Sequence, residues 1–177
     1  MAVAADLCWA TPVALESLTM VRHGESTANA ALAAAIRVEA EEFDKGTRDP
    51  DVGMSDRDRD TGILHGLTAL GVRRRHPAEH RERERLGRFY YRPPGGESWP
   101  DVALRLRPLL PELSGHTLVF THDIVIVMTR YILANLTEPE ILKIESTQLA
   151  NASITRGQRT PTGLRLTTYN DTTHLNP

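Results

Sequence analysis

The sequence contains a single cysteine, Cys8, so no disulfide can form within the chain. It also lacks any apolar run of the length that spans a membrane. Residues 1–15 have no basic residue ahead of their apolar part, which Asp6 interrupts, and this argues against a secretory signal. These absences are compatible with a reducing compartment, and we expect a cytoplasmic protein without a membrane partner.

The chain has little net charge, because 21 basic residues nearly balance 23 acidic ones and leave a formal charge of -2. Such a balance offers no field that would attract nucleic acid. The Arg-rich segment 73–88 interleaves arginine with glutamate at spacings that pair on a helix, which predicts a solvated helix. We therefore expect no nucleic-acid partner.

The sequence also lacks a glycine-rich nucleotide loop, a zinc-ligand spacing and an internal repeat, so we expect no cofactor and no metal. Its 177 residues, of which 40% are hydrophobic and 25% charged, are enough for one sizeable core. We predict a single domain over residues 1–177, in which residues 1–15 form a loose N-terminal arm.

The most informative segment runs from Thr19 to Asn29. Its short apolar part ends in Arg22-His23-Gly24, which predicts a buried strand that delivers a guanidinium and an imidazole to the end of an α/β sheet, where ligands bind. The guanidinium can neutralise the oxygens of a phosphoryl group while the neutral imidazole attacks phosphorus. Ser26 can cap a helix, which we predict from about Asn29 to near Phe43.

A second strand, predicted over 117–121 from its β-branched and apolar residues, ends at His122. The apolar segment 124–136 predicts a buried helix, whose positive N-terminal end would lie beside His122 and favour an anion. Because His23 and His122 each follow a buried strand, we expect both imidazoles at one phosphate site.

Three further elements follow from local signals. Ser98 and Asp101 form a capping box that predicts the start of a helix. Glu138 begins a short helix, and the segments 151–156 and 163–169, joined by 157–162, predict a terminal hairpin.

The run Arg22-His23-Gly24-Glu25-Ser26, together with Asn29, resembles the signature of the histidine phosphatase superfamily, which has the phosphoglycerate mutase-like fold. Four later segments resemble that family's acid-containing segment, its Gly-Glu-Ser segment, its second histidine and a late strand, in the same order, at 58–68, 94–99, 121–123 and 151–153. The resemblance implies an α/β fold of three layers, α/β/α, with a mostly parallel central sheet and the site at the C-terminal ends of its strands.

The resemblance also implies roles for individual residues. His23 would be the nucleophile, and Asp58, four residues before Gly62, would stand at the position of the proton donor, which is usually Glu. The side chains expected to hold the phosphate oxygens are those of Arg22, Asn29 and His122. Glu97 would support substrate binding.

Two of these assignments have equal alternatives. Asp58 could be one more carboxylate in a mixed-charge loop, because Asp56 and Asp60 flank it. Glu97 precedes a helix cap and could have a purely structural role.

The sequence departs from the family pattern after Asp51-Val52-Gly53-Met54-Ser55, which runs directly into the acid-containing segment. Several dozen residues of the usual pattern, including a second phosphate-binding arginine, have no counterpart. Either the protein is a shortened member, or the native protein contains a segment that this chain omits. Arg48, Arg57 or Arg59 could substitute for the second arginine, although each also fits a solvated surface charge, and Arg92 is a further candidate.

The expected function is that of a histidine acid-base phosphatase, which hydrolyses a small phosphomonoester through a phosphohistidine intermediate without metal or cofactor. One alternative is a phosphoglycerate mutase-type phosphotransferase, which returns the phosphoryl group to its substrate. Another is a catalytically weak phosphate-binding or interaction protein. The expected partner is a small phosphorylated substrate, and a homodimer is compatible with the sequence.

Overall fold

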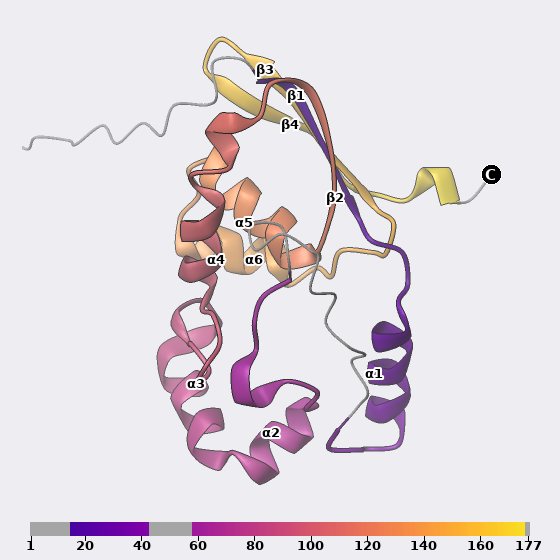
Figure 1. The fold of residues 1–177 in the computed structure, drawn as a ribbon, viewed down its shortest axis with the longest axis vertical. Coiled ribbons are helices and arrows are strands. Elements are labelled where there is room, and N and C mark those ends of the chain that lie inside the picture. Colours follow the sequence, from indigo (N-terminus) through magenta and orange to yellow (C-terminus); the bar gives the residue numbers. More distant parts are fainter. Residues whose placement is uncertain (1–14, 43–57, 176–177) are drawn as a thin grey trace, which may run out of the picture.

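The computed structural model describes residues 15–42 and 58–175, and a four-stranded sheet forms its upper part (Figure 1). The strands are β1 (Leu15–Arg22), β2 (Gly115–Thr121), β3 (Ile154–Thr160) and β4 (Gly163–Asp171). They are ordered β2-β1-β3-β4 across the sheet. β1 is therefore internal, with a partner on each side. Of the predicted N-terminal arm, Leu15 belongs to β1, and residues 1–14 lie outside the described residues.

The sheet is mixed. β1 and β2 pair in parallel, whereas β3 is antiparallel both to β1 and to β4, so three strands run in one direction and β3 runs against them. Arg22 is the register partner of Thr121, and the parallel strands therefore end side by side. The terminal hairpin is confirmed, but its turn is shorter than expected because the strands extend to Thr160 and resume at Gly163.

In the described part of the chain, six α-helices accompany the sheet: α1 (Thr27–Arg37), α2 (Ala69–Arg75), α3 (Pro77–Tyr90), α4 (Trp99–Leu106), α5 (Asp123–Leu133) and α6 (Glu138–Glu145). Figure 1 shows α4, α5 and α6 gathered on one side of the strands, while α1 lies beyond the C-terminal end of β1. This arrangement confirms the α/β class. Within the described ranges no helix is long and apolar enough to cross a bilayer.

The core lies between β1 and the helices α4 and α5. Its fully buried side chains include Leu18 from β1, Leu106 from α4, and Ile126 and Met128 from α5. Each such side chain contributes about 1.5–3 kcal/mol to folding. On the opposite face of the sheet, Leu118 and Phe120 of β2 remain 57% and 68% exposed. The packing therefore anchors β1, which His23 follows, and α5, which His122 precedes.

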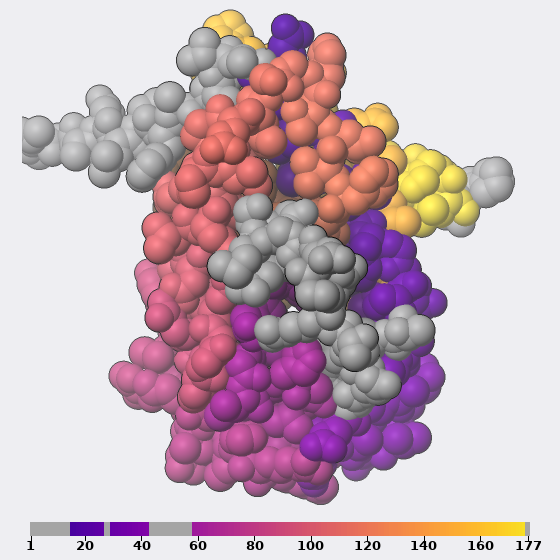
Figure 2. Space-filling model, in the orientation of Figure 1, coloured from indigo at the N-terminus to yellow at the C-terminus, as the bar shows by residue number. Residues whose placement is uncertain are grey.

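α1 ends at Arg37, several residues before the expected end near Phe43. Glu39 adopts a positive φ of 52°, a backbone conformation that terminates a helix, and the chain then turns toward α2. There the hydroxyl of Thr68 donates to the carbonyl of Ala40 at 2.7 Å, and Arg75 Nε donates to a carboxylate oxygen of Glu41 at 2.7 Å. Figure 2 shows the indigo and magenta segments adjoining at the base of the molecule.

The Arg-rich segment 73–88 forms parts of two helices instead of one. α2 ends at Arg75 and α3 begins at Pro77, where a ring without an N–H is tolerated in the first helical turn. The predicted capping box is confirmed, since Ser98 Oγ accepts a hydrogen bond from Asp101 N at 3.3 Å at the start of α4.

Gly87 interrupts the helical geometry of α3 with φ 77° and ψ 164°, a conformation that side chains rarely adopt. We expect Gly87→Ala to lower the free energy of unfolding by about 1–3 kcal/mol. Apart from the adjoining residues and the nearby backbone of the helix itself, no described atom lies within 4 Å of the added Cβ, so the cost would come from the backbone conformation and not from a clash. Urea denaturation measures the change, with Gly24→Ala as the control in equally open space. Equal stability of the two variants would contradict the argument.

Candidate active site

The two histidines meet where β1 and β2 end. The N–H of His23 donates to the carbonyl of Thr121 at 2.9 Å, and the carbonyl of His23 accepts from the N–H of Ala152 at 3.1 Å. The centroid of the His23 ring lies 4.9 Å from that of His122, with the ring planes inclined by 57°. The sheet itself therefore brings together the two imidazoles that the sequence separates by about a hundred residues.

One ring nitrogen of His23 is already engaged. Its Nδ1 lies 2.6 Å from the carbonyl oxygen of Gly24, a contact that favours the tautomer with the hydrogen on Nδ1. In that tautomer Nε2 carries the free electron pair. A neutral imidazole oriented in this way can act as a nucleophile through Nε2.

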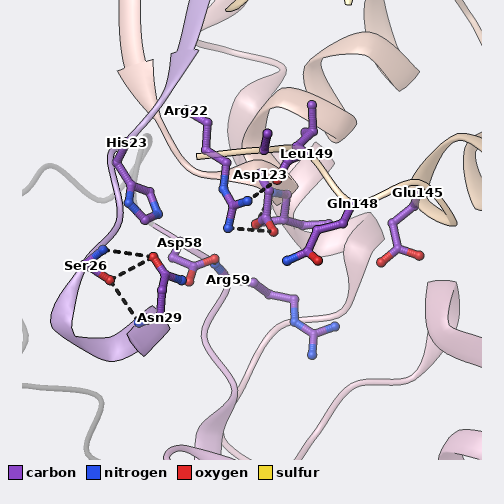
Figure 3. A network of polar contacts seen from close by, with 12 residues as sticks. Arg22, His23, Ser26, Asn29, Asp58, Arg59, Asp123, Glu145, Gln148 and Leu149 are labelled. Atoms are coloured by element: carbon purple, nitrogen blue, oxygen red, sulfur yellow. Dashed lines mark hydrogen bonds and ion pairs between the residues drawn. The ribbon is translucent and has the colours of Figure 1, made fainter. Parts of the chain in front are cut away.

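Arg22 is 6% exposed, and its side chain lies to the right of His23 in Figure 3. Its Nη1 donates to the carbonyl of Leu149, and its Nη2 lies 3.7 Å from a carboxylate oxygen of Asp123. The Nε–H is buried and has no hydrogen-bond partner in the described part of the chain. An unsatisfied buried donor costs about 1–3 kcal/mol, and an oxygen of a bound anion would remove that cost.

Asp123 is a residue that the sequence reasoning missed. It begins α5 immediately after His122, and its Oδ1 accepts a hydrogen bond from the N–H of Ile124 at 2.7 Å. The Asp123 side chain is 46% exposed, so solvent screens its ion pair with Arg22. The sequence signal that could have identified Asp123 is its position immediately after His122.

Asn29 closes the loop that follows His23. Its Oδ1 accepts hydrogen bonds from the N–H and the hydroxyl of Ser26 at 3.1 Å and 3.0 Å, and Ser26 Oγ in turn caps α1 (Figure 3). The oxygen of the Asn29 amide is thus used for structure. Its Nδ2 is the donor that could contact a ligand.

Asp58 lines a cavity of about 400 Å³ that also reaches Asp123 and Leu149, the contacts of Arg22. Asp58 Oδ1 accepts a hydrogen bond from the N–H of Arg59 at 2.7 Å. The cavity therefore begins beside the two residues that contact Arg22, and the carboxyl group of Asp58 lies on its wall.

Both carboxylate oxygens of Glu97 accept hydrogen bonds from within the protein. Arg105 Nε donates to its Oε1 at 2.9 Å, and the N–H of Asp60 donates to its Oε2 at 2.9 Å. These contacts fasten the segment that carries Asp58 to the start of α4. A Cβ on Gly62 would stand 2.1 Å from the carbonyl oxygen of Pro94, so the two segments pack at backbone distance.

Arg59 faces the cavity, and not the bulk solvent that the sequence allowed. Burial lowers the pKa of its guanidinium, and the positive charge of Arg83 acts in the same direction. Of the other arginines considered for the missing second position, Arg48 and Arg57 lie outside the described residues. Arg92 is exposed and forms an ion pair with Asp101.

Arg83 and Arg88 of α3 line the same cavity. Burial lowers the pKa of Arg83, with Arg88 as the next cause, while Arg88 forms an ion pair with Glu145. Burial also raises the pKa of the Glu145 carboxyl. Sequence reasoning treated this segment as wholly solvated, because the alternation of arginine and glutamate does not reveal which face of the helix is covered.

In residues 15–42 and 58–175, no three His, Cys, Asp or Glu side chains are grouped closely enough to hold a metal ion. The site described by these ranges is a cluster of imidazole, guanidinium and carboxylate groups at the ends of two parallel strands. That combination can bind a phosphoryl group, attack it and protonate a leaving oxygen.

Comparisons with known proteins show which family the chain resembles. The family model described as Histidine phosphatase superfamily (branch 1) matches residues 51–172. A 69-residue segment is 38% identical to the 6-phosphofructo-2-kinase/fructose-2,6-bisphosphatase of Caenorhabditis elegans, covering 38% of this chain and 15% of that protein. The chain thus spans only a small part of the length of this relative.

Solved structures resemble the chain over most of its length. Mycobacterial hydrolase 1 has a TM-score of 0.62 and 23% identity, with 88% of this chain and 98% of that chain covered. The mycobacterial glucosyl-3-phosphoglycerate phosphatase Rv2419c, in complex with VO3, has a TM-score of 0.59 and 22% identity, with 89% and 100% covered. At such identities the likeness establishes the fold.

Proposed function

Because the chain belongs to the histidine phosphatase superfamily, we propose that it hydrolyses a phosphomonoester through a phosphohistidine intermediate at His23. The observation that carries the proposal is the pair of imidazoles 4.9 Å apart beside a buried guanidinium whose Nε–H has no hydrogen-bond partner among the described residues. The phosphatases among its relatives and structural neighbours support the reaction class.

In the first step, Nε2 of His23 attacks phosphorus and forms the N–P bond as the ester P–O bond breaks. The departing oxygen takes a proton from the Asp58 carboxyl and leaves as an alcohol. Asp58 suits this task because it lines the cavity into which the rest of the substrate would extend. The proton must come from a neighbouring acid, because an alkoxide is a poor leaving group.

The negative charge on the transferred group would be held by three side-chain donors and by the N-terminal end of a helix. The side-chain donors are Nε of Arg22, the imidazole of His122 and Nδ2 of Asn29. The positive end of the α5 dipole would also stabilise this charge, because His122 is the N-cap of that buried helix. Donors that are already in place cost no reorganisation when the reaction occurs.

In the second step a water molecule attacks phosphorus, giving its proton to the Asp58 carboxylate. A P–O bond forms, the N–P bond breaks, and inorganic phosphate and neutral His23 are released. Glu97 would act as a positioning residue, because its contacts with Asp60 and Arg105 hold the segment that carries Asp58.

A mutase would share the first step and return the phosphoryl group to the substrate. A product assay with 3-phosphoglycerate separates the two reactions.

We expect this chain to be a slow phosphatase with weak affinity for phosphate and vanadate. In the described part of the molecule, Arg22 is the guanidinium beside His23, whereas the family pattern has a second one. Losing one charge-assisted hydrogen bond costs about 1.5–3 kcal/mol, which corresponds to about one to two decades in affinity. Binding of inorganic phosphate by calorimetry and turnover of p-nitrophenyl phosphate measure both quantities.

Turnover typical of an efficient phosphatase would contradict this expectation. It would mean that another arginine occupies the second position. Single alanine variants of Arg48, Arg57, Arg59 and Arg92 would then identify it.

A further inference from the structure

Asp123 places a negative charge beside Arg22, and the proposed reaction gives this carboxylate no task. One of its oxygens lies 3.7 Å from Nη2 of Arg22. In the view of Figure 3 the Arg22 guanidinium lies between the ring of His23 and the carboxylate of Asp123. A distance of 3.7 Å is too long for a hydrogen bond, so the two charges attract each other without a bond that fixes them.

The carboxylate lies beside the part of Arg22 that a phosphoryl group needs. Nε and Nη2 form one edge of a guanidinium, and such an edge binds an oxyanion through two parallel hydrogen bonds. In Arg22, Nη1 donates to the carbonyl of Leu149, whereas Nε has no partner in the described part of the chain. Nη2 faces Asp123. The edge that remains for an incoming anion is therefore the edge that already has an anion next to it.

Asp123 also lies at the positive end of α5. It is the first residue of that helix, and its Oδ1 accepts a hydrogen bond from the N–H of Ile124 at 2.7 Å. A carboxylate in the first turn offsets part of the positive charge at the start of a helix. One side chain thus compensates both the guanidinium and the helix end to which the phosphoryl oxygens are assigned.

The two partners of this ion pair differ in their freedom to move. The side chain of Arg22 is 7% exposed, whereas that of Asp123 is 46% exposed. An entering anion therefore displaces the Asp123 carboxylate toward solvent or binds beside it. The first outcome loses the attraction between Asp123 and Arg22, and the second adds repulsion between two negative groups. Both weaken the binding of the anion.

We propose that Asp123 is a specificity-determining residue, which competes with the phosphoryl group for Arg22 and selects against groups that carry two negative charges. The inference rests on the proposed function, because it takes the phosphoryl group to lie between His23 and Arg22. Coulomb repulsion grows in proportion to the charge of the ligand, so a dianion loses more binding free energy than a monoanion of the same shape. The substrate form that this site favours is then the phosphoryl group with a single negative charge.

Asp123→Asn distinguishes competition from a structural role, because the two predict opposite changes in affinity. The amide oxygen can still accept the hydrogen bond from Ile124, so the start of α5 should persist. The probes are sulfate and perchlorate, tetrahedral anions with two charges and one charge that take up no proton near neutral pH. We expect sulfate to bind about ten- to a hundredfold more tightly to the variant, and perchlorate about three- to tenfold more tightly.

Titrations at constant ionic strength, followed by the NMR resonances of the His23 and His122 rings, measure both affinities. Weaker binding of sulfate to Asp123→Asn would show that the carboxylate merely orients Arg22, and would overturn the proposal. Unchanged binding would overturn it as well. Asp123→Glu keeps the charge, so it should retain most of the discrimination between the two anions.

The matched control is Glu145→Gln, which removes the same charge from another carboxyl on the cavity wall. Glu145 pairs with Arg88 and not with Arg22, so its variant should change the affinity for sulfate by less than about twofold. An equal gain in Glu145→Gln and Asp123→Asn would assign the effect to the total charge of the cavity. That result would reject a specific role of Asp123.

Turnover separates this inference from the proposed function. In a phosphatase, Asp123→Asn should lower KM for p-nitrophenyl phosphate about tenfold and leave kcat nearly unchanged, since the carboxylate repels the ground state and the transition state alike. A fall in kcat that is larger for an alkyl phosphate than for p-nitrophenyl phosphate would make Asp123 a proton donor and overturn the proposal. Tighter sulfate binding by the variant, without turnover by the wild-type chain, would retain the competition and reject the phosphatase.

Discussion

His23→Ala is expected to abolish phosphatase turnover and phosphohistidine formation, with a fall in kcat of at least about a thousandfold. The physical reason is that the variant loses the atom that forms the covalent bond to phosphorus, and removal of a nucleophile typically costs several orders of magnitude. The fold should persist, because the backbone bonds of His23 to Thr121 and Ala152 remain. Rapid quenching after reaction with a labelled phosphomonoester measures the acid-labile phosphohistidine.

Two histidine variants complete this experiment. His122→Ala should slow turnover strongly but still permit some labelling, since it removes a phosphate ligand and leaves the nucleophile in place. His116→Ala should leave turnover unchanged, because this side chain is 77% exposed on β2 and lies outside the site. Thermal unfolding checks that all three proteins are folded. Normal labelling of His23→Ala would remove this residue from the mechanism.

Asp58→Asn is expected to slow the first step by about a hundredfold or more for an alkyl phosphate, the range that general acid catalysis contributes. The effect should be much smaller for p-nitrophenyl phosphate, because nitrophenolate departs without a proton. Since Asp58 would also act as the base in the second step, the comparison must be made on phosphorylation alone. Single-turnover kinetics with each substrate isolates that step.

The control for Asp58 is Glu145→Gln, which neutralises another carboxyl on the same cavity wall. Glu145 pairs with Arg88, away from the leaving oxygen, so its variant should show no dependence on the leaving group. If Asp58→Asn slowed both substrates equally, the acid would be another group. Glu97→Gln would then be the next variant to compare, despite its pairing with Arg105.

Local signals were sufficient to place the two histidines. An apolar strand that ends in a polar turn is encoded within a few residues, and both β1 and β2 end where the sequence indicated. The same is true of the capping box at Ser98 and of the start of α6 at Glu138. In each case the side chain and the backbone group that it satisfies lie within one helical turn.

The sequence predicted less well those features that depend on contacts with distant segments. The end of α1 was expected near Phe43, but the chain leaves the helix earlier and docks Glu41 against Arg74 and Arg75 of α2. The role of Glu97 was equally undetermined, because its partners Asp60 and Arg105 belong to segments whose approach the sequence does not specify.

The sequence by itself determined which strand ends carry imidazole and guanidinium groups, and in what order the segments that resemble the family's motifs follow one another. Only the tertiary structure decided which charges are covered. Arg59 and Arg83 look like ordinary surface arginines in the sequence, and they line a cavity because α3 packs beside the segment that carries Asp58. Burial is a property of the assembled layers, since whether a cation is solvated depends on elements that approach it from elsewhere in the chain.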